Sequence, residues 1–146
     1  MDKRFYPDFF NDVFGPIMQP GSSGSFAGTS RVGRVARRTI KSPLRQVTIA
    51  FNPGDRRHLR NLGNMMDDRG YLGGLQDFAT DDVRLFDAHR LARKQQISYE
   101  FTALPEENGY PGSVQFDLVS VGGETGQLIG QSIGGGMIMI YEINGF

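Results

Sequence analysis

A stretch rich in serine and glycine near the amino terminus holds the first residues that could do chemistry. It reads 18-MQPGSSGSFAGTSRVGRVARRT-39, with Ser22, Ser23 and Ser25 ahead of a predicted helix that carries Arg31 and Arg34. Unpaired backbone N–H groups and the helix dipole favour negative charge at a helix start, so this segment suits a small anion such as a carboxylate. Serine and glycine are also ordinary capping residues, and an arginine face can be simply solvated or an interface for another chain. Both interpretations stay open at this point.

Two nucleotide-binding patterns fail in the same stretch. A P-loop needs a lysine followed by serine or threonine after its glycine-rich turn, and no lysine stands there. The dinucleotide fingerprint fails because no strand precedes Gly21 and because the spacing of Gly21, Gly24 and Gly28 does not match it. The segment is therefore not predicted to bind a nucleotide.

The rest of the chain offers little chemistry of its own. It has no cysteine, which excludes a disulfide, a thiolate nucleophile and a cysteine-ligated metal or iron-sulfur site within this chain. His58 and His89 show no metal-ligand spacing and are expected at the surface. The pair Asp67-Asp68 could do acid–base work, whereas Asp81-Asp82 is better explained as a helix start. Alone, the chain is a poor candidate for an enzyme.

These residues must be positioned by helices that come early in the chain and strands that come late. Helices are expected at 7–14, 27–40 and 81–95, with another between glycines in the polar segment 55–74. An apolar run at 127–133 follows a glycine turn. We predict one α+β domain over residues 1–146, with helices covering a mostly antiparallel sheet of about four strands. Its strands are drawn from Val47–Phe51, Ile97–Ala103, Val114–Val121 and Met137–Ile143.

Composition excludes several classes of protein. A chain of 146 residues that is 38% hydrophobic can bury one core of ordinary size. The formal net charge is zero, which argues against nucleic-acid binding. No apolar run approaches the roughly 18 residues of a membrane span, and the amino terminus lacks a signal-peptide pattern. We therefore expect a cytoplasmic protein with no membrane and no nucleic-acid partner.

Motifs at both ends of the chain resemble a known enzyme family. GSSGSFAGTSRVGRVAR resembles the motif G-P-S-S-S-H-T-x-G-x-x-R-x-G-R-x-A-R in the beta domain of iron-sulfur dependent L-serine dehydratases. The terminal QSIGGGMIMIYEINGF is closer still to that family's S-I-G-G-G-x-I-x-I-x-E-I-N-G-F. Between them, LGNMMD (62–67) is similar to a G-H-G-T-D segment, and FATDDVR (78–84) to a phenylalanine-x-x-Asp-Asp-x-Arg stretch with one residue of slippage. The resemblance spans nearly the whole chain, in order.

The resemblance implies a reaction shared between two polypeptides. An alpha subunit would carry the cysteines and a 4Fe-4S cluster, whose open iron acts as a Lewis acid on the substrate hydroxyl while a proton leaves the α-carbon. Loss of water from L-serine would then give pyruvate and ammonia, a step of amino-acid catabolism and gluconeogenesis. The beta subunit, which this chain resembles, would bind no metal and would close the partner's active site over a small carboxylate substrate. A homodimer is a further expected partner.

The chain departs from the family at three histidines. Ser25-Phe26 stands where the family has His-Thr, Asn64 where it has the histidine of G-H-G-T-D, and Tyr110-Pro111-Gly112 where it has His-Pro-Asn. Histidine can shuttle a proton near neutral pH, whereas serine, asparagine and tyrosine chiefly form hydrogen bonds. The family's usual route of serine dehydration is therefore not expected to apply unchanged. From the motifs at the two ends of the chain, the substrate is expected to be serine or a related small β-hydroxy acid.

The motif positions define a candidate active-site rim. Its residues are expected to converge on one face, and they are Ser22, Ser23, Ser25, Phe26, Asn64, Asp67 and Tyr110. Phe26 either anchors the core or lies partly exposed and reshapes the pocket. Arg31 and Arg34 are the candidate anion or interface residues. The ACT domain that commonly follows this motif is absent after Phe146, as expected for a minimal beta subunit or a trimmed chain.

A second interpretation belongs to a different functional class. The same domain type resembles the allosteric substrate-binding domain in one class of phosphoglycerate dehydrogenases, where it binds anions and performs no chemistry. On that interpretation the chain is a non-catalytic sensing or regulatory domain. It would bind a small carboxylate or phosphate, and Arg31→Ala would weaken that binding.

Overall fold

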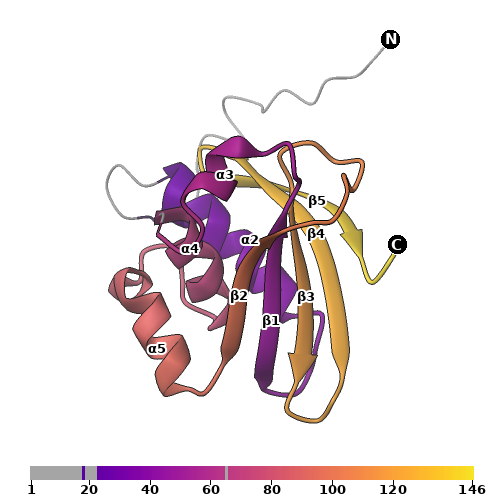
Figure 1. The fold of residues 1–146 in the computed structure, drawn as a ribbon. Helices are drawn as coiled ribbons and strands as arrows, with labels where there is room; N and C mark the ends of the chain where they lie inside the picture. Colours follow the sequence, from indigo (N-terminus) through magenta and orange to yellow (C-terminus); the bar gives the residue numbers. More distant parts are fainter. Residues whose placement is uncertain (1–17, 19–22, 65) are drawn as a thin grey trace.

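The computed structural model describes residues 18, 23–64 and 66–146, and in this part helices gather on one face of a single sheet (Figure 1). The helix predicted at 7–14 lies outside the described residues. The strands are β1 (Leu44–Phe51), β2 (Ser98–Ala103), β3 (Val114–Ser120), β4 (Thr125–Gly134) and β5 (Met137–Ile143). The helical elements are the π-helical turn η1 (Ser23–Gly28), α2 (Thr29–Arg37), α3 (Arg56–Arg60), α4 (Met66–Leu75), the 3-10 turn η2 (Val83–Asp87) and α5 (Ala88–Lys94).

The sheet has five strands in the order β2-β1-β3-β4-β5. Strands β1 and β2 are parallel, and the other three pairings are antiparallel. This confirms the predicted α+β class and the mostly antiparallel sheet, but the predicted number of about four strands is one too low. The additional strand is β4, in which Gly126, Gly130 and Gly134 interrupt the alternation of apolar and polar residues that marks a half-buried strand.

The core lies between the sheet and the helices. Alternate residues of β3 are buried, as expected for a strand with one covered face. Side chains from both layers fill this core, namely Val32, Ala36, Val47, Ile49, Phe51, Leu72, Leu75, Phe116, Leu118 and Leu128. The opposite face carries a polar ladder, in which Gln115 and Gln127 each donate a hydrogen bond to Asp117. The helices therefore attach to one side of the sheet through apolar burial.

The serine-rich stretch is helical rather than a loop, which corrects the predicted helix at 27–40. The helical backbone starts at Ser23 and α2 ends at Arg37. Phe26 is fully buried and contacts Phe78 and Leu85 in a second apolar cluster, so burial of its ring pulls the segment onto the domain. The Thr29 hydroxyl donates a hydrogen bond to the Ser25 carbonyl at 2.6 Å, so one backbone carbonyl of this π-helical turn has a hydrogen-bond partner.

The helix predicted at 81–95 is divided into two parts. Asp82 is the N-cap, as predicted, and its carboxylate accepts a hydrogen bond from the Arg84 N–H at 2.9 Å. The first turn, η2, is a 3-10 helix, and the α-helical part begins only at Ala88. None of the helices in the described residues has the length and apolar character that a membrane crossing requires.

Glycines allow α2 and α4 to pack with their backbones almost in contact. A methyl group on Gly33 would collide with the Tyr71 carbonyl, and one on Gly74 would collide with the Ser30 carbonyl. Gly70 likewise faces the side chain of Thr29. The sequence predicted one helix in the segment 55–74, and the described residues form two, α3 and α4. The close approach of α4 to α2 brings the start of α4 next to the serine-rich turn.

Candidate functional site

A cavity of about 400 Å³ lies where η1, α3, the start of α4 and the end of β4 meet. Polar and titratable side chains from all of these elements face it. They are Ser25, Thr29, Asp55, Arg57, His58, Asp67, Tyr71, Gln131 and Ser132. Gly112 and Gly134 complete the lining. The volume lies within the usual range for sites that bind small molecules.

The end of β1 positions the first group of these residues. The strand stops at Phe51, the chain turns through Asn52-Pro53-Gly54, and Asp55 then caps the short helix α3. The Asp55 carboxylate accepts a hydrogen bond from the backbone N–H of His58 at 3.2 Å. Its other oxygen lies 2.7 Å from Nδ1 of the same histidine. One carboxylate therefore fixes both the helix start and the imidazole.

His58 bridges two carboxylates from different helices. Its Nε2 lies 3.3 Å from Oδ2 of Asp67, which is in the first turn of α4. The side chains of His58, Asp55 and Asp67 are only 13%, 13% and 9% exposed, so all three are largely shielded from water. Each lines the cavity. The result is a largely buried Asp–His–Asp cluster that lines the cavity.

The surroundings change the pKa of both central groups. Burial lowers the pKa of His58, but its hydrogen bonds with Asp67 and Asp55 and their negative charges outweigh burial and raise it above the usual value. Burial raises the pKa of Asp67, but the bond from His58, the charge of Arg57 and a hydrogen bond from Ser25 lower it overall. The arrangement therefore favours an ionised Asp67 beside a histidine that retains its proton above the usual pH.

Two of the predicted rim residues meet in this cavity. Ser25 comes from the amino-terminal motif and Asp67 from the G-H-G-T-D-like motif, and a hydrogen bond between their side chains contributes to the low pKa of Asp67. Tyr71, one turn along α4 from Asp67, also lines the cavity. Arg57 approaches Asp67 to 3.6 Å with a side chain that is 73% exposed, so its charge is available at the mouth.

Other predicted rim residues lie elsewhere. Asn64 is exposed and does not line the cavity. The Tyr110 hydroxyl donates to Glu142, and its ring stacks on Tyr141, so its side chain faces the outer edge of the sheet. Only its neighbour Gly112 lines the cavity. Neither Asn64 nor Tyr110 therefore lines this cavity, because a motif position does not fix where a side chain points.

The serine-rich turn contributes less than expected. Phe26 has no exposed surface, which matches the core-anchor interpretation and contradicts a partly exposed ring in the pocket. Ser22 lies outside the described residues, and of Ser23 only the helical backbone is described. A methyl group on Gly28 would collide with Ser132, so Gly28 lets η1 pack against β4.

The arginine face forms a separate hollow of about 340 Å³, lined by Arg31, Arg34, Val35, Arg38 and Ile138. Arg31 donates a hydrogen bond to the Gly136 carbonyl and so holds the turn between β4 and β5. Arg34 and Arg38 both contact the Asp77 carboxylate, at 3.1 and 3.0 Å. This acidic partner lies outside the segment 21–41, which contains no aspartate or glutamate. The positive charge of the arginine face is therefore partly neutralised by Asp77.

The expectation that both histidines lie at the surface is wrong. His58 is largely buried in the cluster, and the ring of His89 contacts Tyr99 and Phe101, with Nε2 buried and without a hydrogen-bond partner among the described residues. The signal for His58 was an aspartate three residues before it, the spacing of a helix cap. Its second partner, Asp67, is nine residues away on another helix, and no local pattern predicts that contact.

Comparison with known proteins finds two relatives, each matched over 135 residues. The chain is 34% identical to a protein of Bacillus subtilis (strain 168) named probable L-serine dehydratase, beta chain. It is 33% identical to the L-serine dehydratase, beta chain, of Peptoniphilus asaccharolyticus. Each match covers 92% of this chain and 60% of the relative, so the chain spans less than two thirds of the relatives' length. No protein-family model matches the chain.

Proposed function

This chain is related to the beta chains of L-serine dehydratases, and from that premise we propose that it is the beta subunit of a hydro-lyase acting on L-serine or a related small β-hydroxy acid. The chain closes the active site of an alpha subunit and is inactive alone. Its product from serine is pyruvate, with release of ammonia. The cavity bordered by Ser25, His58 and Asp67 is the part of the active site that this chain supplies.

One observation carries the proposal. Ser25 and Asp67 belong to two of the motifs on which the resemblance rests, and they lie on one cavity although they come from different helical elements. A core-packing role alone would not require polar side chains from these motifs to face an open volume. A cavity of about 400 Å³ suits a small polar substrate far better than a macromolecule.

The residues of this chain do not fit an iron-sulfur cluster as ligands. Such clusters are held by cysteine thiolates, and the chain has no cysteine. The described residues also contain no group of three His, Cys, Asp or Glu side chains placed to hold a metal ion. We therefore assign any 4Fe-4S cluster of this enzyme to the cysteine-bearing alpha subunit.

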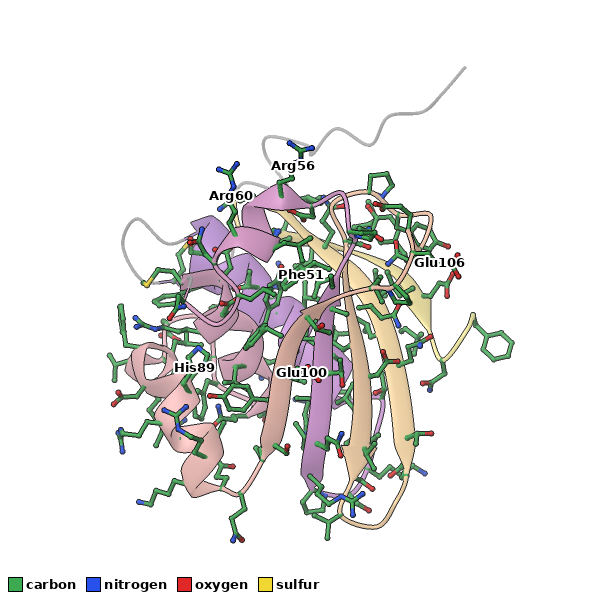
Figure 2. The ribbon with its side chains drawn as sticks, viewed as in Figure 1. Phe51, Arg56, Arg60, His89, Glu100 and Glu106 are labelled. Atoms are coloured by element: carbon green, nitrogen blue, oxygen red, sulfur yellow. The ribbon has the colours of Figure 1, made fainter. Side chains whose placement is uncertain are left out.

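The side chains of the cavity can bind and orient a small amino acid. Arg57 supplies an exposed positive charge at the mouth, suited to a substrate carboxylate, and Arg56 and Arg60 on the outer side of α3 point away from the domain and extend this basic rim (Figure 2). Inside, Asp67 supplies the negative charge that a substrate ammonium group requires. Arg57 and Asp67, whose charged groups lie 3.6 Å apart, present a positive and a negative charge side by side, which favours a zwitterion over a simple carboxylate.

Co-expression with a cysteine-bearing alpha subunit, which we expect to be encoded beside this chain, tests the proposal. The pair is purified without oxygen, and pyruvate formation from L-serine is measured, with this chain alone as the control. We expect a stable complex with lyase activity and no activity from the control. If no complex forms and no small hydroxy acid is dehydrated, the proposed function is wrong.

The arginine hollow favours one alternative function, a non-catalytic anion-sensing domain like that of phosphoglycerate dehydrogenases. Three arginines line it, which suits a carboxylate or phosphate, although Asp77 already contacts two of them. On this alternative the isolated chain binds citrate or inorganic phosphate saturably, and Arg31→Ala weakens the binding. Calorimetry that detects no binding of either anion would exclude it.

A further inference from the structure

His58 is built into the cavity more rigidly than a surface residue needs. Its ring lies flat on the Phe51 ring, its Nδ1 faces the capping carboxylate of Asp55, and its backbone N–H is bonded to the same carboxylate. Three contacts therefore define both the position and the rotation of one imidazole. Such fixed orientation of a titratable group is typical of sites where a proton is transferred.

The contacts of His58 also define which of its two ring nitrogens can accept a proton. The 2.7 Å contact of Nδ1 with Asp55 places a proton on Nδ1, because a carboxylate oxygen is an acceptor. The lone pair of neutral His58 is then on Nε2, which lies 3.3 Å from Oδ2 of Asp67, another residue that lines the cavity. That contact is long for a charge-assisted hydrogen bond, so a substrate group can replace it at little cost.

We propose that His58 is the base of this site and takes the place of the motif histidines that the chain lacks. The inference rests on the proposed function and assigns the proton transfer to a residue outside all the motifs of the resemblance. Besides His58, the charged or titratable groups among the described residues that line the cavity are Asp55 and Arg57 from the start of α3 and Asp67 and Tyr71 from α4. None of these four offers an imidazole nitrogen lone pair whose direction is fixed by contacts of the ring.

The proposed step balances without another reactant. Nε2 of neutral His58 takes the α-proton of the substrate, so a C–H bond breaks and an N–H bond forms. The electron pair of the C–H bond becomes the new carbon–carbon double bond as the β-hydroxyl leaves with its own pair. The proton on His58 then passes to the hydroxide, which leaves as water, and the imidazole returns to its neutral state. Asp55 holds the Nδ1 proton throughout and stabilises the imidazolium.

The pH profile of kcat/KM in the complex tests the assignment. A base must be deprotonated, so wild-type activity should rise with pH and reach half its plateau above about pH 6.5, the usual pKa of histidine. Asp55→Asn keeps an equally good helix cap but removes a charge that raises the pKa of His58. It should therefore move the rising limb to lower pH. His58→Gln should lower kcat by at least about 100-fold.

A second measurement separates a chemical role from a structural one. Long-range nitrogen NMR of the histidine-labelled chain in the complex should show the His58 ring signals shift when L-serine is added, with the His89 signals unchanged as the internal control. The inference is overturned if His58→Gln, folded and in complex, retains the wild-type kcat, or if the rising limb stays in place in Asp55→Asn. A wild-type complex without lyase activity would instead defeat the proposed function, and the assignment of His58 with it.

Discussion

The imidazole of His58 lies flat against the phenyl ring of Phe51, with 4.5 Å between the ring centroids and 2° between the ring planes. Phe51 is the last residue of β1 and is almost fully buried in the core. The stack therefore ties the Asp–His–Asp cluster to the rigid sheet rather than to the short helix α3 alone. Because the contacts of the cluster raise the pKa of His58, that pKa depends on whether the local fold is intact.

The stability of the domain should depend on pH through His58. Its pKa is higher in the folded state than in the unfolded chain, so its contribution is fully present below about pH 6.5 and is lost as pH rises through the folded pKa. The wild type should therefore exceed His58→Gln in free energy of unfolding by more at about pH 5.5 than at about pH 9. Urea unfolding at both pH values measures the difference.

His89 supplies the matched control with the opposite sign. Burial and the charges of Arg69 and Arg93 lower its pKa, so its contribution is present above about pH 6.5 and is lost as pH falls toward the folded pKa. The free energies of unfolding of His89→Gln and the wild type should therefore differ less at acid pH than at alkaline pH. Equal pH dependence of the two variants would show that the cluster around His58 does not form.

Phe26 should be a major contributor to stability. Its ring has no exposed surface and contacts Phe86 edge-on at 4.8 Å between centroids, so truncation leaves a cavity. Phe26→Ala should reduce the free energy of unfolding by about 3–5 kcal/mol. Phe146→Ala, at a side chain that is 97% exposed, should change it by less than about 0.5 kcal/mol. A small effect at Phe26 would mean that its ring is exposed to solvent.

Gly74 tests the close packing of α2 on α4. In an isolated helix, Gly→Ala is favourable by about 1 kcal/mol, but here the new methyl group would overlap the Ser30 carbonyl. Overpacking of backbone against backbone usually costs about 1–3 kcal/mol, so Gly74→Ala should destabilise the domain in thermal unfolding. Gly122→Ala, whose methyl group would make only ordinary contact with Ser42 at 3.5 Å, is the control.

The ion pairs of Asp77 should contribute little to the stability of the domain. Asp77 contacts Arg34 and Arg38 with a side chain that is 57% exposed, and exposed pairs of this kind contribute at most about 1 kcal/mol. Asp77→Asn tolerates the positive φ of 64° at this position and should change the melting temperature only slightly. Added salt should remove even that difference. A large loss of stability would show that Asp77 has a structural role beyond these two pairs.

Sequence patterns predicted much of this fold for local reasons. Strand β3 alternates Val114, Phe116 and Leu118 toward the core, and Asp82 precedes the turn that it caps. Strand β4 was less evident because its glycines let neighbouring elements approach and leave no alternating pattern. The π-helical start at Ser23 was missed because burial of Phe26 in a distant cluster, rather than helix propensity, draws this segment into place.

The candidate site was less predictable than the fold. The resemblance identified Ser25 and Asp67, since motif residues are recognisable without knowledge of their contacts. His58 and Arg57 lie outside every motif, and the contact of His58 with Asp67 depends on the angle between α3 and α4. Such a contact depends on tertiary packing, which local patterns in a single sequence do not specify.

Asp67→Asn in the complex tests most directly whether this cavity belongs to the active site. The variant retains the size of Asp67 but removes the charge that faces His58 and the cavity, so kcat/KM for L-serine should fall by at least about 100-fold. Complex formation should persist, and Asp77→Asn, on the arginine face, should stay within about two-fold of wild type. An intact Asp67→Asn complex with wild-type kcat/KM would contradict the account.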